Sequence, residues 1–190
     1  MVSNTKTFAI VMAMVMGAIL SAERARADQT DPRLPELFEA LRLAPDENAA
    51  LHAERAITKL WHQGGAPDLT KDLAEAKRLI QRWSFDQALE ILNELIARAP
   101  RFAEAWNTRA TLHYIEHKYN ASIVDVERTL ELEPRHFGAL AGLGEIRFTS
   151  GQLHDALKAF KRALAVHPNL PLVKYRVGML REKLGQVTSE

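Results

Sequence analysis

The sequence lacks cysteine altogether, which excludes a disulfide framework and a lipid attached to an N-terminal cysteine. It also lacks an excess of charge of either sign, with 25 Lys and Arg residues against 24 Asp and Glu. A nucleic-acid-binding protein needs a basic face that displaces counterions from phosphates, so this class is not expected. There is no glycine-rich phosphate loop and no convincing strand pattern. What remains is typical of a soluble helical protein, 47% hydrophobic and 26% charged.

The first 27 residues differ from the rest and are typical of a secretory signal. Lys6 gives the N-terminal region a positive charge, and Phe8–Leu20 forms the apolar region. Ala25-Arg26-Ala27 has small residues at the two key positions of a cleavage site. Cleavage would leave Asp28 first, with 22 basic against 23 acidic residues in the mature chain. This predicts a secreted protein, in the periplasm of a Gram-negative bacterium. An uncleaved segment that anchors the protein in the membrane is the alternative.

A unit of 34 residues recurs three times, and its clearest copy is 137–170. That copy carries Leu140, Leu143, Gly144, Gly151, Ala156, Phe160, Ala163 and Pro168 at places 4, 7, 8, 15, 20, 24, 27 and 32. Pro134 and Pro100 precede Pro168 by one and two periods. Because proline disfavours a helical conformation in the residue before it, the second helix of each unit should end before its proline.

Each unit should contain two antiparallel helices, predicted at about 70–82, 86–98, 103–116, 120–132, 137–150 and 154–166. Small residues at places 8 and 20 allow the two helices to approach closely. Gly151, at place 15, suits the left-handed conformation that ends a helix. Trp83 and His117 hold this place in the other copies, so their turns must close differently or bear more strain.

The pattern resembles the tetratricopeptide repeat, whose period is 34 residues with a Trp-Leu-Gly-Tyr, Ala-Phe and Pro signature. The structural positions of the repeats are Ala88, Pro100, Trp106, Ser122, Pro134, Gly144, Ala156 and Pro168. The resemblance implies an all-α fold, a right-handed solenoid of antiparallel helix pairs. It also implies a concave surface that holds a peptide or a partner protein, without catalysis and without a cofactor.

The predicted organisation follows from this register. It comprises a signal segment (1–27), a linker and N-terminal helical hairpin (28–68), three repeats (69–102, 103–136 and 137–170), a capping helix (171–185) and a tail (186–190). We interpret the hairpin as a degenerate N-terminal repeat or cap. The last helix continues the repeat register but is more polar, as the end of a solenoid requires.

The register also predicts which side chains line the concave surface. They are Lys77, Ile80, Asn107, Thr111, Tyr114, Glu145, Phe148 and Tyr175. Aromatic residues with polar neighbours are the composition of a binding surface. The alternative is that these side chains pack on the N-terminal hairpin or on one another. Some family members grip a C-terminal carboxylate with lysines and asparagines, but only Lys77 and Asn107 approach such a set, so an apolar or mixed peptide is expected.

One motif points to a different class of function. His113, Glu116 and His117 form a His-x-x-Glu-His sequence, the inverted zinc-protease motif. Two imidazoles four residues apart on a helix can share a metal, with the glutamate as base. However, the register directs His113 toward its partner helix and puts His117 at a turn, which makes a zinc-dependent hydrolase the minor hypothesis.

Overall fold

The structure, a computed structural model, describes residues 31–63 and 66–187. The described part of the chain is helical throughout, without a strand. Its helices are α2 (Leu34–Arg42), α3 (Glu47–His62), α4 (Pro67–Gln81), α5 (Phe85–Arg98), α6 (Ala103–Ile115), α7 (Tyr119–Leu132), α8 (Phe137–Thr149), α9 (Leu153–Val166) and α10 (Pro171–Val187). The all-α prediction is therefore confirmed, while the predicted signal segment lies outside the described residues.

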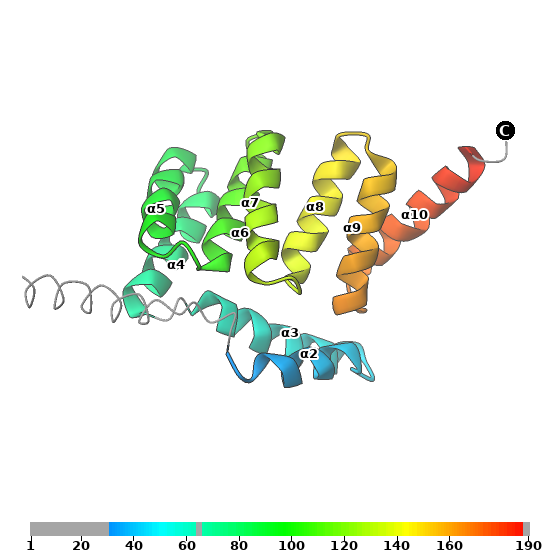
Figure 1. Cartoon of the computed structure of the whole chain (residues 1–190), viewed down its shortest axis with the longest axis horizontal. Coiled ribbons are helices and arrows are strands. Elements are labelled where there is room, and N and C mark those ends of the chain that lie inside the picture. The colour runs from blue at the N-terminus through cyan, green and yellow to red at the C-terminus, as the bar shows by residue number, and fades with distance from the viewer. Residues whose placement is uncertain (1–30, 64–65, 188–190) are drawn as a thin grey trace, which may run out of the picture.

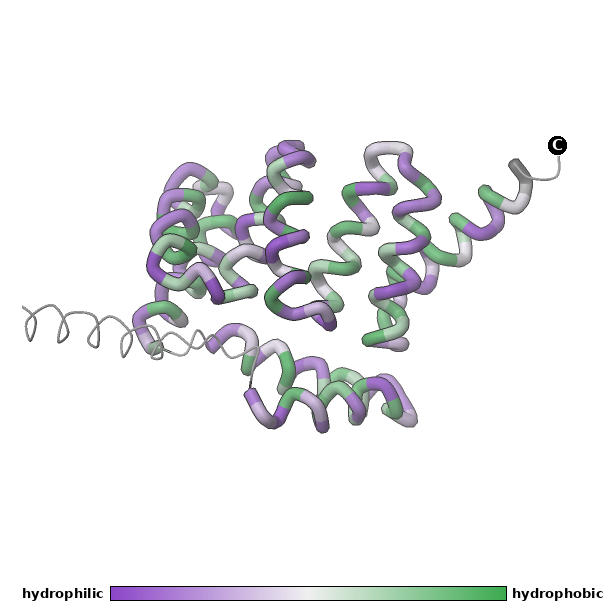
Figure 2. Tube along the Cα trace, in the orientation of Figure 1, coloured by the Kyte–Doolittle hydropathy of each residue, from purple (hydrophilic) through white to green (hydrophobic). Residues whose placement is uncertain are grey.

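Helices α4 to α9 form three antiparallel pairs that stand side by side in a row, as Figure 1 shows. Every helix predicted for the repeats begins and ends within three residues of the observed one. Hydrophobic and hydrophilic residues alternate along these helices (Figure 2), as expected where one side of each helix packs on its neighbours. The stack is thus an all-α solenoid.

Small residues bring the two helices of a pair together. Gly144 of α8 lies against the ring of Phe160 of α9, and a Cβ at this position would overlap that ring. In the preceding pair, Ser122 replaces alanine, and its hydroxyl donates a 2.7 Å hydrogen bond to the carbonyl oxygen of Ala110. The departure from alanine therefore adds a bond between the two helices without adding bulk.

The turn inside each pair closes in the same way in all three repeats. Trp83, His117 and Gly151 all have positive φ angles, of 61°, 59° and 75°. The backbone N–H of each donates to the carbonyl three residues before, and the next N–H donates to the carbonyl five residues before it. This is the Schellman motif that ends helices. The turns at Trp83 and His117 were expected either to close differently or to bear more strain. They close in the same way, so both residues bear the strain of a left-handed conformation.

The C-terminal helix α10 repeats half of a unit. Val173, Val177 and Leu180 are buried in one hydrophobic cluster with residues of α8 and α9. Gly178 occupies the place equivalent to Gly144, but a Cβ there would meet no atom within 4 Å. The helix continues to Val187, two residues beyond the predicted boundary at 185.

The hairpin of α2 and α3 does not extend the row of repeats. In Figure 1 it crosses beneath the row, along the helix ends at which one repeat connects to the next. Residues of α2 and α3 form a hydrophobic cluster with Phe137, and Val166 and Leu170 pack against it. Trp61 stacks on His136 with ring centroids 4.2 Å apart, and the guanidinium of Arg135 lies 4.1 Å from the ring centroid of Phe38. These contacts fix the hairpin to the second and third repeats.

Candidate functional site

A small pocket opens between α6 and α8, on the side predicted to be concave. Its volume is about 160 Å³. Small side chains create the space, because Ala110, Ala139 and Gly142 face it and a Cβ at Gly142 would meet nothing within 4 Å. We call this the groove pocket, and it is lined by Asn107, Ala110, Thr111, Tyr114, Ser122, Val126, Gly138, Ala139, Gly142, Glu145 and Ile146.

Four of the eight predicted binding residues meet in the groove pocket. They are Asn107, Thr111, Tyr114 and Glu145. Ala110, Val126 and Ile146 supply buried apolar surface beside them. The pocket thus combines an apolar interior with hydroxyl, amide and carboxylate groups, which is the usual chemistry of a ligand pocket.

Phe148 of α8 and Tyr175 of α10 do not line the pocket. The guanidinium of Arg176 stacks on Phe148, 4.6 Å from the ring centroid, and bonds both carboxylate oxygens of Glu145 at 2.9 and 3.2 Å. Tyr175 is 65% exposed and therefore free to contact another molecule. Arg176 is a residue that sequence reasoning missed, because the register places it just outside the concave set.

Lys77 and Ile80 lie at the other end of the concave side and do not line the pocket. Ile80 packs against the hydrophobic cluster of the first repeat. Lys77 donates a 2.6 Å hydrogen bond to Glu104, and its Nζ lies 2.8 Å from Nε2 of His62 in α3. These two residues therefore make internal contacts, and their part in partner binding stays a prediction.

Glu104 is the centre of a buried polar cluster that joins the hairpin to the repeats. Nδ1 of His136 accepts a hydrogen bond from the backbone N–H of Ala139, so the ring proton is on Nε2. Nε2 donates this proton in a 2.9 Å hydrogen bond to Glu104. Nε2 of His62 lies 3.2 Å from the other carboxylate oxygen. Sequence reasoning missed this cluster, because nothing in the 34-residue period indicates that α3 crosses over Glu104.

Burial raises the pKa of Glu104, but the surrounding groups outweigh it. Hydrogen bonds from His136 and His62 and the nearby charge of Lys77 hold this pKa well below its ordinary value of 4.5. Glu104 is therefore ionised at neutral pH although only 5% of it is exposed. A buried carboxylate of this kind depends on its partners, since an unpaired charge in the interior is costly.

The His113 motif is not assembled into a metal site. His117 lies at the strained turn, where its Nδ1 is 3.0 Å from the hydroxyl of Tyr119. Burial lowers the pKa of His113, whose Nε2 lies 3.8 Å from Asp125, a residue that is paired with Arg109. Among residues 31–63 and 66–187, no three His, Asp or Glu side chains are placed to hold a metal ion. The geometry gives the hydrolase hypothesis no support.

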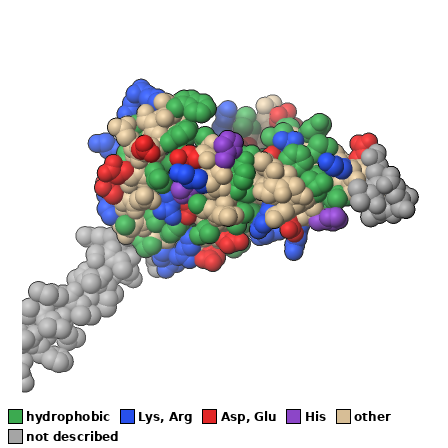
Figure 3. Space-filling model, turned by 90° about the horizontal axis from the view of Figure 1, so that it is seen from above, with side chains coloured by type: hydrophobic (Ala, Val, Ile, Leu, Met, Phe, Trp, Pro, Cys, Tyr) green, Lys and Arg blue, Asp and Glu red, His purple; other side chains and the backbone are tan. Residues whose placement is uncertain are grey.

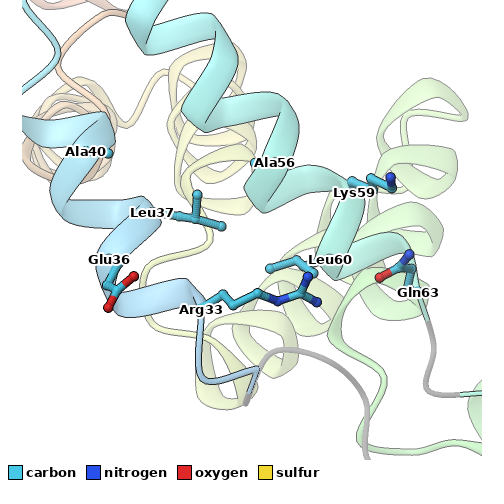
Figure 4. A pocket seen from close by; sticks show the side chains of 8 residues that line it. All are labelled: Arg33, Glu36, Leu37, Ala40, Ala56, Lys59, Leu60 and Gln63. Atoms are coloured by element: carbon cyan, nitrogen blue, oxygen red, sulfur yellow. The ribbon is translucent and has the colours of Figure 1, made fainter.

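A larger and more open hollow, of about 690 Å³, lies between the two helices of the hairpin. Figure 4 shows Leu37 and Leu60 between the helices and Arg33, Glu36 and Lys59 around them. Arg33 is paired with Asp31 at 2.8 Å. The hollow has apolar walls but no convergent polar groups, so its size alone does not make it the better candidate.

Comparison with known proteins identifies the family. The family model of the tetratricopeptide repeat matches residues 108–171. A TPR repeat-containing protein of Rhizobium etli is 34% identical over 166 residues, which cover 87% of this chain and 81% of that protein. The chain belongs to the tetratricopeptide repeat family. The resemblance stated from the 34-residue period is thereby confirmed.

Solved structures of tetratricopeptide repeats have the same fold. The TPR domain of Sgt2 from Aspergillus fumigatus is 17% identical with a TM-score of 0.60, covering 66% of this chain and 84% of that domain. The first TPR of Spaghetti (RPAP3), bound to an HSP90 peptide, is also 17% identical, with a TM-score of 0.59 and coverage of 62% and 93%. At such identities the likeness concerns the fold of the tetratricopeptide repeats alone.

Proposed function

We propose that this tetratricopeptide repeat protein is a non-enzymatic adaptor that binds a peptide or a partner protein in its concave groove. The observation that carries the proposal is the groove pocket, where Asn107, Tyr114 and Glu145 surround a small apolar interior. A volume of about 160 Å³ suits one side chain of a bound peptide rather than a whole ligand. The ring of Tyr175 on the C-terminal helix is exposed and offers a further aromatic contact.

The chemistry of the groove favours an apolar or mixed peptide. The first TPR of Spaghetti (RPAP3) is bound to an HSP90 peptide that ends in Glu-Glu-Val-Asp. Here the two side chains nearest to a carboxylate clamp are already engaged, because Lys77 bonds Glu104 at 2.6 Å and the amide of Asn107 bonds it at 3.3 Å. The lining of the pocket has no Lys or Arg to pair with an acidic side chain, and the nearby Arg176 is already bonded to Glu145.

A substitution that fills the groove pocket tests whether it binds the partner. Gly142→Leu should occupy the pocket without strain in the free protein, because the space beside Gly142 is open. We expect a pull-down from envelope extract to recover a specific partner with the unchanged protein, and to lose it with Gly142→Leu and with Tyr114→Ala/Phe148→Ala. Gly178→Leu on α10 is the matched control, since its Cβ also meets open space. Recovery of the same partner by all variants, with helical circular dichroism retained, would remove the groove assignment.

We further propose that the protein is secreted to the periplasm after loss of residues 1–27. The support is the sequence pattern alone, a basic start, an apolar stretch and a small-residue cleavage site. None of the described helices has the length and hydrophobicity needed to cross a bilayer. N-terminal sequencing of the mature protein should read Asp28 first, whereas an intact N-terminus in the membrane fraction would favour the anchor.

A further inference from the structure

A second hollow lies where the hairpin meets the first repeat, between α3 and the first turn of α4. Its volume is about 600 Å³, within the range of ligand-binding clefts. We call it the seam pocket, and it is lined by Leu51, Glu54, Arg55, Thr58, Lys59, His62, Gln63 and Thr70. All but Thr70 come from α3 or from Gln63, which directly follows it, so this site belongs to the hairpin rather than to the repeats.

Positive charge exceeds negative charge in the lining of the seam pocket, where Arg55 and Lys59 stand against Glu54. Arg55 and Lys59 are exposed, and neither forms a hydrogen bond or an ion pair with another described residue. The carboxylate of Glu54 is directed to His167, with 3.2 Å between Oε2 and Nε2. Lys77, whose Nζ lies beside His62, bonds Glu104 instead. Two free cations in one hollow therefore attract an anionic partner.

The spacing of the two cations fits an extended peptide. Arg55 and Lys59 are four residues apart on a helix, which separates their Cα atoms by about 6 Å along the axis. In an extended chain, side chains on the same face recur every two residues, or about 6.6 Å. Carboxylates at alternate positions can thus meet both cations in register.

The rest of the lining supports a peptide rather than an inorganic ion. Leu51 is 37% exposed and gives the hollow an apolar patch, while Thr58 and Thr70 contribute side chains with hydroxyl groups. Nucleic-acid grooves for single strands instead combine basic residues with aromatic side chains on which bases stack. The seam pocket has no aromatic residue other than His62. Figure 3 shows that, on the face it presents, charges of both signs are interspersed.

We propose that the seam pocket is a docking site for an acidic, extended segment of a partner protein, in which carboxylates two residues apart pair with Arg55 and Lys59. The next side chain on the same face of the segment, two residues from the carboxylate that pairs with Arg55, is apolar and packs on Leu51. This site is separate from the groove pocket, and the proposal does not depend on what the groove binds.

Fluorescence anisotropy tests the site with a labelled peptide that carries leucine, glutamate and glutamate at three alternate positions, with serine between them. We expect binding by the unchanged protein, and at least tenfold weaker binding by Arg55→Glu/Lys59→Glu, because two charge-assisted contacts become repulsive. Arg55→Gln/Lys59→Gln should weaken binding in the same direction. The matched control is Lys158→Glu/Arg162→Glu, which changes the net charge equally at two exposed cations of α9 and should alter binding less than twofold.

Several results would overturn the proposal. One is an equal loss in the control pair, which would mean unspecific attraction. Another is equal binding of the peptide with glutamine in place of glutamate, or no binding to the unchanged protein up to about 1 mM. Equal or tighter binding of a single-stranded oligonucleotide of the same charge would point to nucleic acid instead. Gly142→Leu separates the two sites, since it should leave this peptide's affinity unchanged, and a comparable loss would place the peptide in the groove.

Discussion

Replacing Glu104 with leucine should lower the free energy of unfolding by about 3–5 kcal/mol, the usual cost of removing one partner from a buried ion pair. Lys77 would lose its 2.6 Å partner, and the Nε2–H of His136, which is 3% exposed, would have no acceptor. Urea denaturation followed by circular dichroism measures the loss. For a chain of this size the thermal midpoint should fall by roughly 10 °C.

Glu104→Gln separates the charge from the hydrogen bonds. Its side-chain oxygen can still accept from His136, so the loss should be smaller, about 1–3 kcal/mol. Glu39→Gln, which removes an exposed partner of Arg42, should leave the midpoint nearly unchanged. If Glu104→Leu proved as stable as the unchanged protein, the cluster would not hold the hairpin to the repeats.

The same carboxylate predicts a dependence on pH with a definite sign. Because partners depress the pKa of Glu104 below its ordinary value of 4.5, the folded state binds this proton less readily than the unfolded state. Its contribution to stability is therefore complete above pH 4.5 and is lost as the pH falls through the folded pKa. The stability difference between the unchanged protein and Glu104→Gln should shrink below pH 4.5, and a difference that stayed constant or grew would contradict this account.

Trp83→Gly should stabilise the protein by about 0.5–1 kcal/mol. A left-handed conformation costs a residue with a Cβ about 1–2 kcal/mol, and glycine recovers this at the expense of greater freedom in the unfolded chain. Trp83 has a φ of 61° and is 76% exposed, so little packing is lost beyond its contact with Phe85. Urea denaturation again measures the change.

Two variants isolate the backbone effect in this prediction. Trp83→Ala removes the indole but keeps a Cβ in the left-handed conformation, so it should not gain stability. Gly151→Ala makes the opposite change at the equivalent turn, where φ is 75°, and should cost about 1–2 kcal/mol. Equal effects of Trp83→Gly and Trp83→Ala would show that strain at this turn is not significant.

The repeats could be predicted from the sequence because each place in the period has one local physical task. Pro168 ends a helix, Gly144 admits the ring of Phe160, and Gly151 permits a positive φ, all within a single unit. These effects act over a few residues or between two adjacent helices. The bounds of α4 to α9 were therefore predictable to within three residues.

The position of the hairpin could not be predicted in the same way. It depends on contacts between distant residues, such as Trp61 with His136 and Glu54 with His167, which no local pattern signals. For the same reason, no sequence pattern indicated that Lys77 would bond His62 across the hairpin boundary. The groove pocket was partly predictable, since Asn107, Tyr114 and Glu145 follow the helical register, but its small-residue walls appear only once α6 and α8 are placed together.

The central claim is that the groove between α6 and α8 is the partner-binding site. Amide chemical shifts of the protein, recorded while the peptide of a recovered partner is added, test it most directly. The account predicts that the largest changes occur at Asn107, Gly138 and Gly142, whereas Gly151 and Gly178 stay unchanged. Changes concentrated on α10 beyond Gly178 or on the exposed face of α7 around Val124, with the groove amides unmoved, would contradict it.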